Sequence, residues 1–396
     1  MNYVFSDKIT PLKPSAIREI FKVAQDPSVI TLAAGNPAGE SFPIEKLKEL
    51  SNEIYETMGI PALQYGMTEG YTPLREKVKS RLSTNFSIGN DYDDVIITSG
   101  GQQGLDLACK VFCNEHDTVL CENPSFIGAL NAFRAYNVNL VGIDMDDEGI
   151  DIAKLESTLK TVSNVKILYL IPTFQNPSGK CMSLKRRLDV LELCKKYNVI
   201  IVEDNPYGEL RFKGEDIPTI KSFDTEGRVI YSGSFSKILS AGMRVGFVCA
   251  HKDITSKIVV AKQVNDVHTN MFFQVLVDKF IEKYGLDEHI AFLRDLYREK
   301  CDLMLSCLDE KMDKRVKYTR PEGGLFIWCT LPKEYDSAEF AKIAVNKKVA
   351  VVPGNTFLAD ENAISSSFRI NYSTPTNENI VKGIDILSQV ISEYLK

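Results

Sequence analysis

Four hydroxyl or basic side chains lie close together in the second half of the sequence. Ser234, Ser236 and Lys237 follow the apolar run 229–231, and Arg244 comes seven positions after the lysine. A lysine amine that loses its charge can form a Schiff base with a carbonyl compound. Hydroxyls and a planar guanidinium suit a phosphate oxyanion. Because most lysines are solvated surface residues, the neighbouring motifs must decide whether Lys237 has this role.

Two further segments predict polar side chains at the ends of buried strands. Residues 199–202 and 167–171 are near-continuous apolar runs, which are typical of parallel strands buried on both faces. Asp204 follows the first run and Asn176 follows the second. Open α/β sheets bind ligands at the carboxyl ends of their strands, so we expect these two residues to lie side by side. A helix cap for Asp204 and a turn role for Asn176 are the alternatives.

A third predicted strand, residues 95–98, leads through a turn of small residues with Gly101 and Gln102 into a helix. A helix amino terminus offers free N–H groups and the positive end of its dipole to an anion, most often phosphate. A fourth predicted strand, residues 118–121, precedes Phe126, whose ring would lie at the same edge. A reactive amine, a buried acid, an amide, an aromatic ring and a phosphate site together match the chemistry of pyridoxal phosphate.

These motifs, in this order, resemble the class I/II aminotransferases, which are fold-type I pyridoxal-phosphate enzymes. The likeness is greatest for the branch of 2-aminoadipate, kynurenine and broad-specificity aromatic or branched-chain aminotransferases. It extends over essentially the whole chain, from residues 14–20 to residues 366–372. The resemblance implies a three-layer α/β/α fold around a mostly parallel sheet, with a smaller α+β domain. Alternating strand and helix patterns between residues 42 and 284 agree with this fold class.

The resemblance also implies a role for each residue around the cofactor. Lys237 forms the Schiff base with the cofactor and moves the proton between the substrate α-carbon and cofactor atom C4′. Asp204 pairs with the protonated ring nitrogen, and Tyr207 and Asn176 hydrogen-bond to the phenolic oxygen. Burial beside a cationic cofactor would lower the pKa of Lys237, as this chemistry requires.

For the cofactor phosphate, the resemblance implies backbone or side-chain donors from Gly101 and Gln102. Ser234 and Ser236 would supply hydroxyls. Arg244 would supply a guanidinium, and its spacing from the catalytic lysine favours this role over that of a surface charge.

Two residues depart from the family pattern. Phe126 stands where many relatives have tyrosine, which keeps ring stacking but removes a hydroxyl contact. Gly101 stands where close relatives often have serine, which removes one phosphate ligand and keeps the backbone donors. We expect both changes to tune cofactor binding without preventing it.

Substrate binding is expected to depend on two arginines, an asparagine and a glycine. In segment 368–372, strand alternation places Arg369 opposite the aromatic residues, where a plain surface arginine would also lie. The resemblance instead implies that Arg369 binds the substrate carboxylate, with Asn176 beside it and Gly35 at the site entrance. Arg18 lies in a segment that resembles a mobile helix, so it either binds an acidic substrate side chain or is a solvated charge.

Tyr65 matches a tyrosine that, in the family, reaches the cofactor phosphate of the neighbouring subunit. The resemblance therefore implies a homodimer with shared active sites. Tyrosine next to glycine, as in Tyr65-Gly66, is otherwise common in turns.

Bulk properties limit the class of protein. The 396 residues predict two domains: residues 36–285 as the large cofactor-binding domain, and residues 1–35 with 286–396 as the small one. A net charge of −6 argues against nucleic acid as the main partner. The nine cysteines lack CxxC spacing and the four histidines form no cluster, so we expect reduced thiols and no metal. No signal peptide or membrane-spanning run is evident, which favours the cytoplasm.

Together these observations predict an aminotransferase that works by a ping-pong mechanism. An amino acid of the 2-aminoadipate, aromatic or branched-chain type donates its amino group, and a 2-oxo acid, expected to be 2-oxoglutarate, takes it up. A lyase acting at the β-carbon is the alternative enzyme, since pyridoxal phosphate also supports elimination. A regulatory module would need a DNA-binding region, for which the sequence before the site entrance leaves no room.

Overall fold

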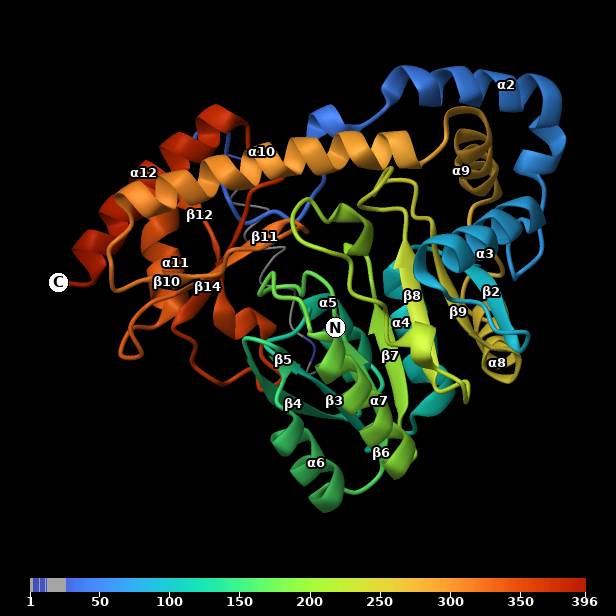
Figure 1. Cartoon of the computed structure of the whole chain (residues 1–396), viewed down its shortest axis with the longest axis horizontal. Coiled ribbons are helices and arrows are strands. Elements are labelled where there is room, and N and C mark those ends of the chain that lie inside the picture. The colour runs from blue at the N-terminus through green and yellow to red at the C-terminus, as the bar shows by residue number, and fades with distance from the viewer. Residues whose placement is uncertain (1–2, 7, 11, 13–25) are drawn as a thin grey trace.

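An eight-stranded sheet forms the centre of the larger part of the molecule (Figure 1). The computed structural model describes residues 3–6, 8–10, 12 and 26–396. The strands of this sheet are β2 (Asp93–Thr98), β3 (Thr118–Asn123), β4 (Asn139–Asp146), β5 (Gly149–Ile150), β6 (Val165–Leu170), β7 (Ile200–Asp204), β8 (Val229–Ser234) and β9 (Gly246–His251). Their order is β2-β9-β8-β7-β6-β3-β4-β5. β9 is antiparallel to both neighbours and β5 to β4, while the other pairs are parallel, so the predicted mostly parallel sheet is confirmed.

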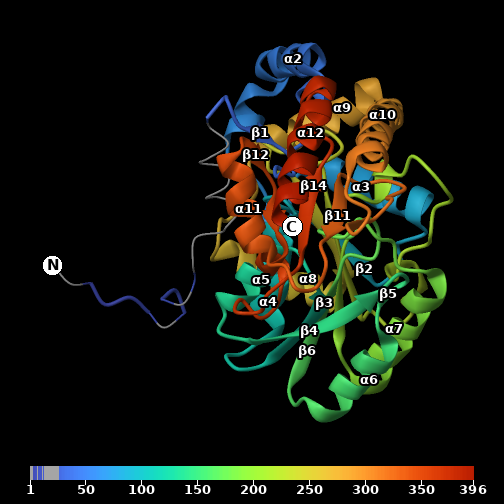
Figure 2. The same ribbon diagram turned by 90° about the vertical axis from the view of Figure 1, so that its left-hand side faces the viewer.

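Helices cover both faces of this sheet and give the predicted three layers (Figures 1 and 2). On one face, α4 (Gly101–Phe112) packs against α5 (Ile127–Arg134) and α8 (Lys252–Gln263). On the other face, α6 (Ile152–Thr161) packs against α7 (Leu184–Tyr197). At the β2 edge, α3 (Thr72–Phe86) contacts α9 (Met271–Tyr284), along which α2 (Ile44–Leu63) also lies.

The remaining strands form the smaller part of the molecule, which contains segments from both end regions of the described chain. β10 (Lys317–Tyr318), β11 (Phe326–Thr330), β14 (Ser367–Asn371) and β13 (Val352–Pro353) form an antiparallel sheet in that order. β1 (Ile30–Thr31) pairs in parallel with β12 (Val349–Ala350). β12 and β13 are thus separated by one residue in the sequence but belong to two different sheets. α11 (Ser337–Asn346) and α12 (Asn377–Tyr394) pack here, and the long α10 (Asp287–Lys311) runs from α9 to this sheet (Figure 1).

Local sequence explains how the chain enters β7, which carries Asp204. The side chain of Ser183 caps α7 by accepting a hydrogen bond from a backbone N–H in its first turn. Asn198 ends α7 in the left-handed region, at φ 54°, a conformation that asparagine tolerates. The apolar strand that follows is buried on both faces. Within the part of the chain that the structure describes, no helix is long and apolar enough to span a membrane.

Arg187 on α7 ties together the ends of the loop that carries Asn176. Its guanidinium is fully buried and donates to the backbone oxygens of Pro172 at 2.8 Å and Met182 at 3.0 Å. It also donates to the Thr173 hydroxyl at 2.9 Å. Because buried carbonyl groups need partners, Arg187 fixes the loop on both sides of the asparagine.

We expect Arg187→Met to lower the free energy of unfolding by about 3 kcal/mol or more, because several buried acceptors lose their donor. Urea denaturation followed by circular dichroism measures the change. Lys185→Met on the same helix is the control, since that side chain is 83% exposed and its replacement should cost less than about 0.5 kcal/mol. Equal urea midpoints for the two variants would rule out this role for Arg187.

Candidate active site

A cavity of about 280 Å³ lies at the carboxyl ends of β6, β7 and β8, where they meet the start of α4 and the smaller sheet. Of the predicted site residues that the structure describes, all but Tyr65 line it. Parallel strands that end at one edge of a sheet explain why residues distant in sequence meet here. The predicted residues around the cavity are Gly35, Gly101, Gln102, Phe126, Asn176, Asp204, Tyr207, Ser234, Ser236, Lys237, Arg244 and Arg369.

The amine of Lys237 points into this cavity from the turn that follows β8. Its Nζ donates a hydrogen bond to the backbone oxygen of Gly35 at 2.7 Å. Burial, and then the positive charges of Arg369 and Arg244, lower the pKa of Lys237 to about 8. A substantial fraction of this amine is therefore neutral near pH 8, as a nucleophile requires.

Asp204 is a buried acid held by a tyrosine from the neighbouring strand. The Tyr169 hydroxyl donates to Asp204 Oδ2 at 2.9 Å, and both residues are buried. Burial raises the pKa of Asp204 to about 7, and the hydrogen bond from Tyr169 opposes that rise. Tyr169 was not predicted as a site residue, because it lies in the apolar run 167–171. The available signal was a single phenol in an otherwise aliphatic strand.

Arg369 on β14 brings the smaller sheet to the cavity. Its Nη1 donates to Asn176 Oδ1 at 2.8 Å and its Nη2 to the backbone oxygen of Ala33 at 2.9 Å. The guanidinium carbon lies 4.1 Å from the ring centroid of Phe326 and 4.9 Å from that of Phe357. Arg369 is 2% exposed and its Nε has no hydrogen-bond partner. The alternative of a surface arginine is therefore wrong.

Tyr207 lies beside Asn176 on the wall of the same cavity. Burial raises the pKa of the Tyr207 phenol, so this hydroxyl stays protonated near neutral pH. Its ring meets that of Phe326 edge to face, with centroids 5.7 Å apart. The phenol is thereby held at the boundary between the two sheets.

The turn before α4 and Arg244 form one end of the cavity. Gly100 has φ +79°, and a Cβ there would lie 2.2 Å from Arg244 Nη2, so only glycine fits. Arg244 donates to the backbone oxygen of Ser99 and to the Ser236 hydroxyl, each at 3.4 Å. The side chain of Gln102 donates to the backbone oxygen of Gly128 at 2.7 Å, so the donor it can offer to an anion is its backbone N–H in the first turn of α4. This end of the cavity offers several donors and a positive charge.

Tyr65 does not line the cavity described above. Arg18 lies outside the described residues, so its role stays a prediction. The Tyr65 side chain is described and is 82% exposed. Its ring lies edge-on to that of His268, with centroids 5.7 Å apart.

The residues present fit pyridoxal phosphate group by group. The buried amine of Lys237 suits the aldehyde, the buried carboxyl of Asp204 suits the ring nitrogen, and the phenol of Tyr207 suits the phenolic oxygen. The donors around the start of α4 suit the phosphate. The donor set therefore agrees with the cofactor that the sequence predicted.

The chain belongs to the family of class I and II aminotransferases, whose model, "Aminotransferase class I and II", matches residues 27–387. It is 44% identical to aromatic-amino-acid aminotransferase 1 of Thermococcus litoralis, over 99% of this chain and 95% of that protein. It is 40% identical to the 2-aminoadipate transaminase of Thermus thermophilus, over 97% of this chain and 95% of that protein. The crystal structure of Pyrococcus horikoshii kynurenine aminotransferase in complex with PMP matches with a TM-score of 0.95 and 42% identity, over 99% of this chain and 98% of that one.

This protein is therefore a pyridoxal-phosphate-dependent aminotransferase of fold type I. The predicted family, fold class, cofactor and reaction class are confirmed. The role of each individual side chain belongs to the proposal below.

Lys237→Met tests the cost of burying the amine. The pKa of Lys237 is about 8 in the folded protein, against an ordinary value of 10.5. Between pH 8 and pH 10.5 the unfolded chain binds more protons than the folded chain. Burial of the charged amine therefore lowers the free energy of unfolding of wild type. This loss of stability is complete below pH 8 and vanishes as the pH rises to 10.5. We expect the stability advantage of Lys237→Met over wild type, without cofactor, to fall by about 2 kcal/mol between pH 7 and pH 10.

Urea denaturation at the two pH values measures this difference, and Lys185→Met, with its exposed side chain, provides the control. A parallel pH dependence for wild type and Lys237→Met would contradict the lowered pKa.

Proposed function

We propose that this enzyme transfers the α-amino group of an aromatic, kynurenine-type, 2-aminoadipate or branched-chain amino acid to a 2-oxo acid, with 2-oxoglutarate as the usual acceptor, by a ping-pong mechanism. The observation that carries the proposal is the half-buried Lys237 amine, with its lowered pKa, which lines one cavity together with Asp204, Asn176 and Arg369. The aromatic, 2-aminoadipate and kynurenine-type donors follow the names of relatives that share 40–44% of their residues with this chain, and the branched-chain type is retained from the resemblance in sequence.

When bound, pyridoxal phosphate supplies the aldehyde for amine exchange and the ring that takes up electrons from the substrate α-carbon. Lys237 holds the cofactor and carries a proton to and from that carbon. Asp204 supplies a carboxylate for the ring nitrogen, and Tyr169 orients that carboxylate through its hydroxyl. Since burial raises the pKa of Asp204 to about 7, a positive partner is needed to keep it ionised at neutral pH.

Arg369 is proposed to bind the substrate carboxylate. Its two aromatic neighbours hold the guanidinium plane, and its unpaired Nε is a free donor. The hydrogen bond to Asn176 joins this carboxylate site to the cofactor's phenolic oxygen, which Tyr207 and Asn176 are proposed to contact. Ser234, Ser236, Arg244 and the turn before α4 are proposed to hold the phosphate.

A homodimer with shared sites is proposed from the surface around Tyr65. This tyrosine is 82% exposed, and nearby Ile60, Leu63 and Met67 are 83%, 70% and 65% exposed. Large apolar side chains gathered on one surface mark an interaction site. A second copy of the chain would cover them and bring Tyr65 to the other subunit's phosphate site.

The division into residues 36–285 and residues 1–35 with 286–396 is retained as a proposal. All strands of the eight-stranded sheet lie within residues 36–285, and β1 pairs with β12 within the second set of residues.

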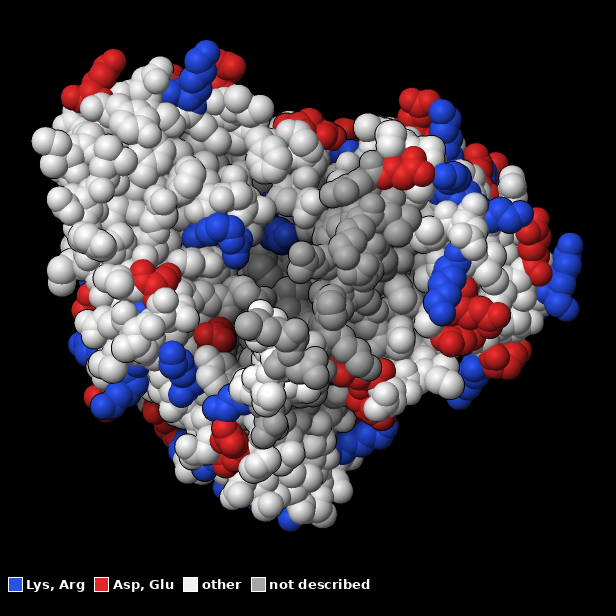
Figure 3. Space-filling model, turned by 180° about the vertical axis from the view of Figure 1, so that it is seen from behind, with Lys and Arg blue, Asp and Glu red and all other residues white. Residues whose placement is uncertain are grey.

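A location in the cytoplasm is supported by the nine cysteines, all of which are unpaired in the structure. Acidic and basic side chains are interspersed around the face shown in Figure 3, which is hollowed near its centre, and this supports small molecules as partners over nucleic acid.

The reaction is tested by mixing the cofactor-loaded enzyme with single amino acids and no oxo acid, and recording absorbance by stopped flow. We expect aromatic, kynurenine-type, 2-aminoadipate or branched-chain donors to convert the lysine-bound cofactor to its amine form, and 2-oxoglutarate to reverse the change. Lys237→Ala should lose both the starting absorbance and turnover, because the amine that forms the bond is absent. Release of pyruvate and ammonia with the starting absorbance retained would favour the β-carbon lyase.

Shared sites are tested by mixing two inactive variants, Lys237→Ala and Tyr65→Ala, under conditions that exchange subunits. In a mixed dimer, one site has both Lys237 and the partner's intact tyrosine, so about a quarter of wild-type activity should return at equal mixing. If Tyr65 serves its own subunit, no mixed site is complete and no activity returns. A sedimentation experiment that finds only monomers would reject the dimer itself.

A further inference from the structure

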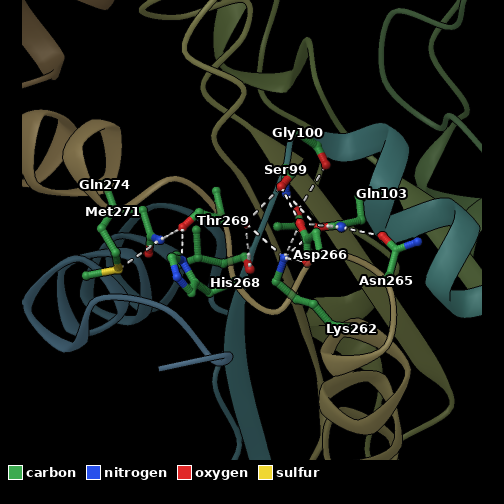
Figure 4. A network of polar contacts seen from close by, with 12 residues as sticks. Ser99, Gly100, Gln103, Lys262, Asn265, Asp266, His268, Thr269, Met271 and Gln274 are labelled. Carbon is green, nitrogen blue, oxygen red and sulfur yellow. Dashed lines mark hydrogen bonds and ion pairs between the residues drawn. The ribbon is translucent and has the colours of Figure 1, made fainter. Parts of the chain in front are cut away.

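A polar network lies beside the turn before α4 and is centred on a lysine that the mechanism above does not use (Figure 4). Lys262 on α8 is fully buried. Its Nζ donates to Gln103 Oε1 at 2.7 Å, to Asp266 Oδ1 at 2.8 Å and to Thr269 Oγ1 at 3.0 Å. All three donors of the ammonium group are thus satisfied by protein acceptors.

The same network binds Ser99, the residue that begins the phosphate turn. The Ser99 hydroxyl donates to Asp266 Oδ2 at 2.7 Å, and the Ser99 N–H donates to Gln103 Oε1 at 2.8 Å. On its other side, the Ser99 carbonyl accepts from Arg244. The network therefore binds the hydroxyl and the N–H of Ser99, while Arg244, which lines the cavity, binds the Ser99 carbonyl oxygen.

Lys262 has a second effect, because its positive charge balances the negative charge of Asp266. Burial alone would raise the pKa of Asp266, but hydrogen bonds from Lys262, Ser99 and Gln103 hold that pKa below its usual value. Asp266 is thus an anion one hydrogen bond away from an anion-binding turn. Without the positive charge of Lys262, this carboxylate would repel a phosphate bound at the turn.

We propose that Lys262 is a positioning residue for the cofactor phosphate, which fixes Ser99 through Gln103 and Asp266 and neutralises the Asp266 carboxylate beside the turn. This inference rests on the proposed role of the turn and Arg244 in holding phosphate. Lys262 contacts neither cofactor nor substrate in this arrangement. Its effect should therefore be specific to the phosphate group of the cofactor.

The test compares pyridoxal phosphate with pyridoxal, which lacks the phosphate, as ligands of the cofactor-free protein. Dissociation constants come from absorbance titrations. For Lys262→Met we expect the affinity for pyridoxal phosphate to fall on the order of tenfold, a size typical of residues that support a ligand shell, while pyridoxal affinity stays constant. The ³¹P chemical shift of bound cofactor should move with it.

Two further variants separate the effect of the Asp266 charge from the effect of the hydrogen bonds that fix Ser99. Adding Asp266→Asn to Lys262→Met removes the unbalanced carboxylate and should restore most of the lost affinity for pyridoxal phosphate. Ser99→Ala deletes one hydroxyl, so it should fold even if Lys262→Met does not, and it should show a smaller loss confined to the phosphorylated ligand. An equal weakening of both ligands, or no change in either, would overturn the proposal.

Lys221→Met is the matched control. Lys221 is equally buried and pairs with Asp93 at 2.8 Å and Asp224 at 3.0 Å. Asp93 begins β2, whereas Ser99 follows the last residue of that strand. This control should lose stability without changing the ratio of the two affinities.

Arg244→Gln separates this inference from the proposed function. If Arg244→Gln selectively weakens pyridoxal phosphate and Lys262→Met does not, only the role of Lys262 fails. If Arg244→Gln leaves the ratio of affinities unchanged, the phosphate site itself is misplaced.

Discussion

The structure depends on keeping three ionisable side chains, Lys237, Asp204 and Arg369, around one cavity. Asp204 and Arg369 are buried and Lys237 is half-buried, and burial shifts the pKa of each towards the neutral form. Moving a charge out of water is costly unless partners compensate. The surrounding strands and loops supply those partners, and the cofactor's positive ring nitrogen and negative phosphate supply more. The site is thus built for a charged ligand.

Much of the protein's buried polarity supports this cavity from a distance. Tyr169 orients Asp204, Arg187 fixes the loop that carries Asn176, and Lys262 binds the residues that hold the turn before α4. Each comes from the strands or the helix layers of the large sheet, not from the cavity wall. A rigid layer of this kind keeps reacting groups in place, because side chains locked by packing and hydrogen bonds lose little freedom when a ligand binds.

The two sheets contribute different chemistry. The eight-stranded sheet and the turns that follow its strands supply the amine, the acid and the donors proposed for the phosphate, whereas the smaller sheet supplies Arg369 on β14. The hydrogen bond between Arg369 and Asn176 joins the two parts across the cavity. A substrate carboxylate at Arg369 would therefore be placed against a cofactor held by the other sheet.

The sequence by itself determined the strands that end at the cavity and the residues that follow them, because apolar runs and turn residues are local signals. These signals placed Lys237, Asp204 and Asn176, whereas Arg244 was assigned from the resemblance to the family and its spacing from Lys237. The sequence could not determine that Arg369 is buried, since strand alternation alone places a polar residue towards water and only the packing of both faces removes that water. Tyr169 and Lys262 were missed for the same reason: their partners lie on other elements, and only the tertiary structure brings them within hydrogen-bond distance.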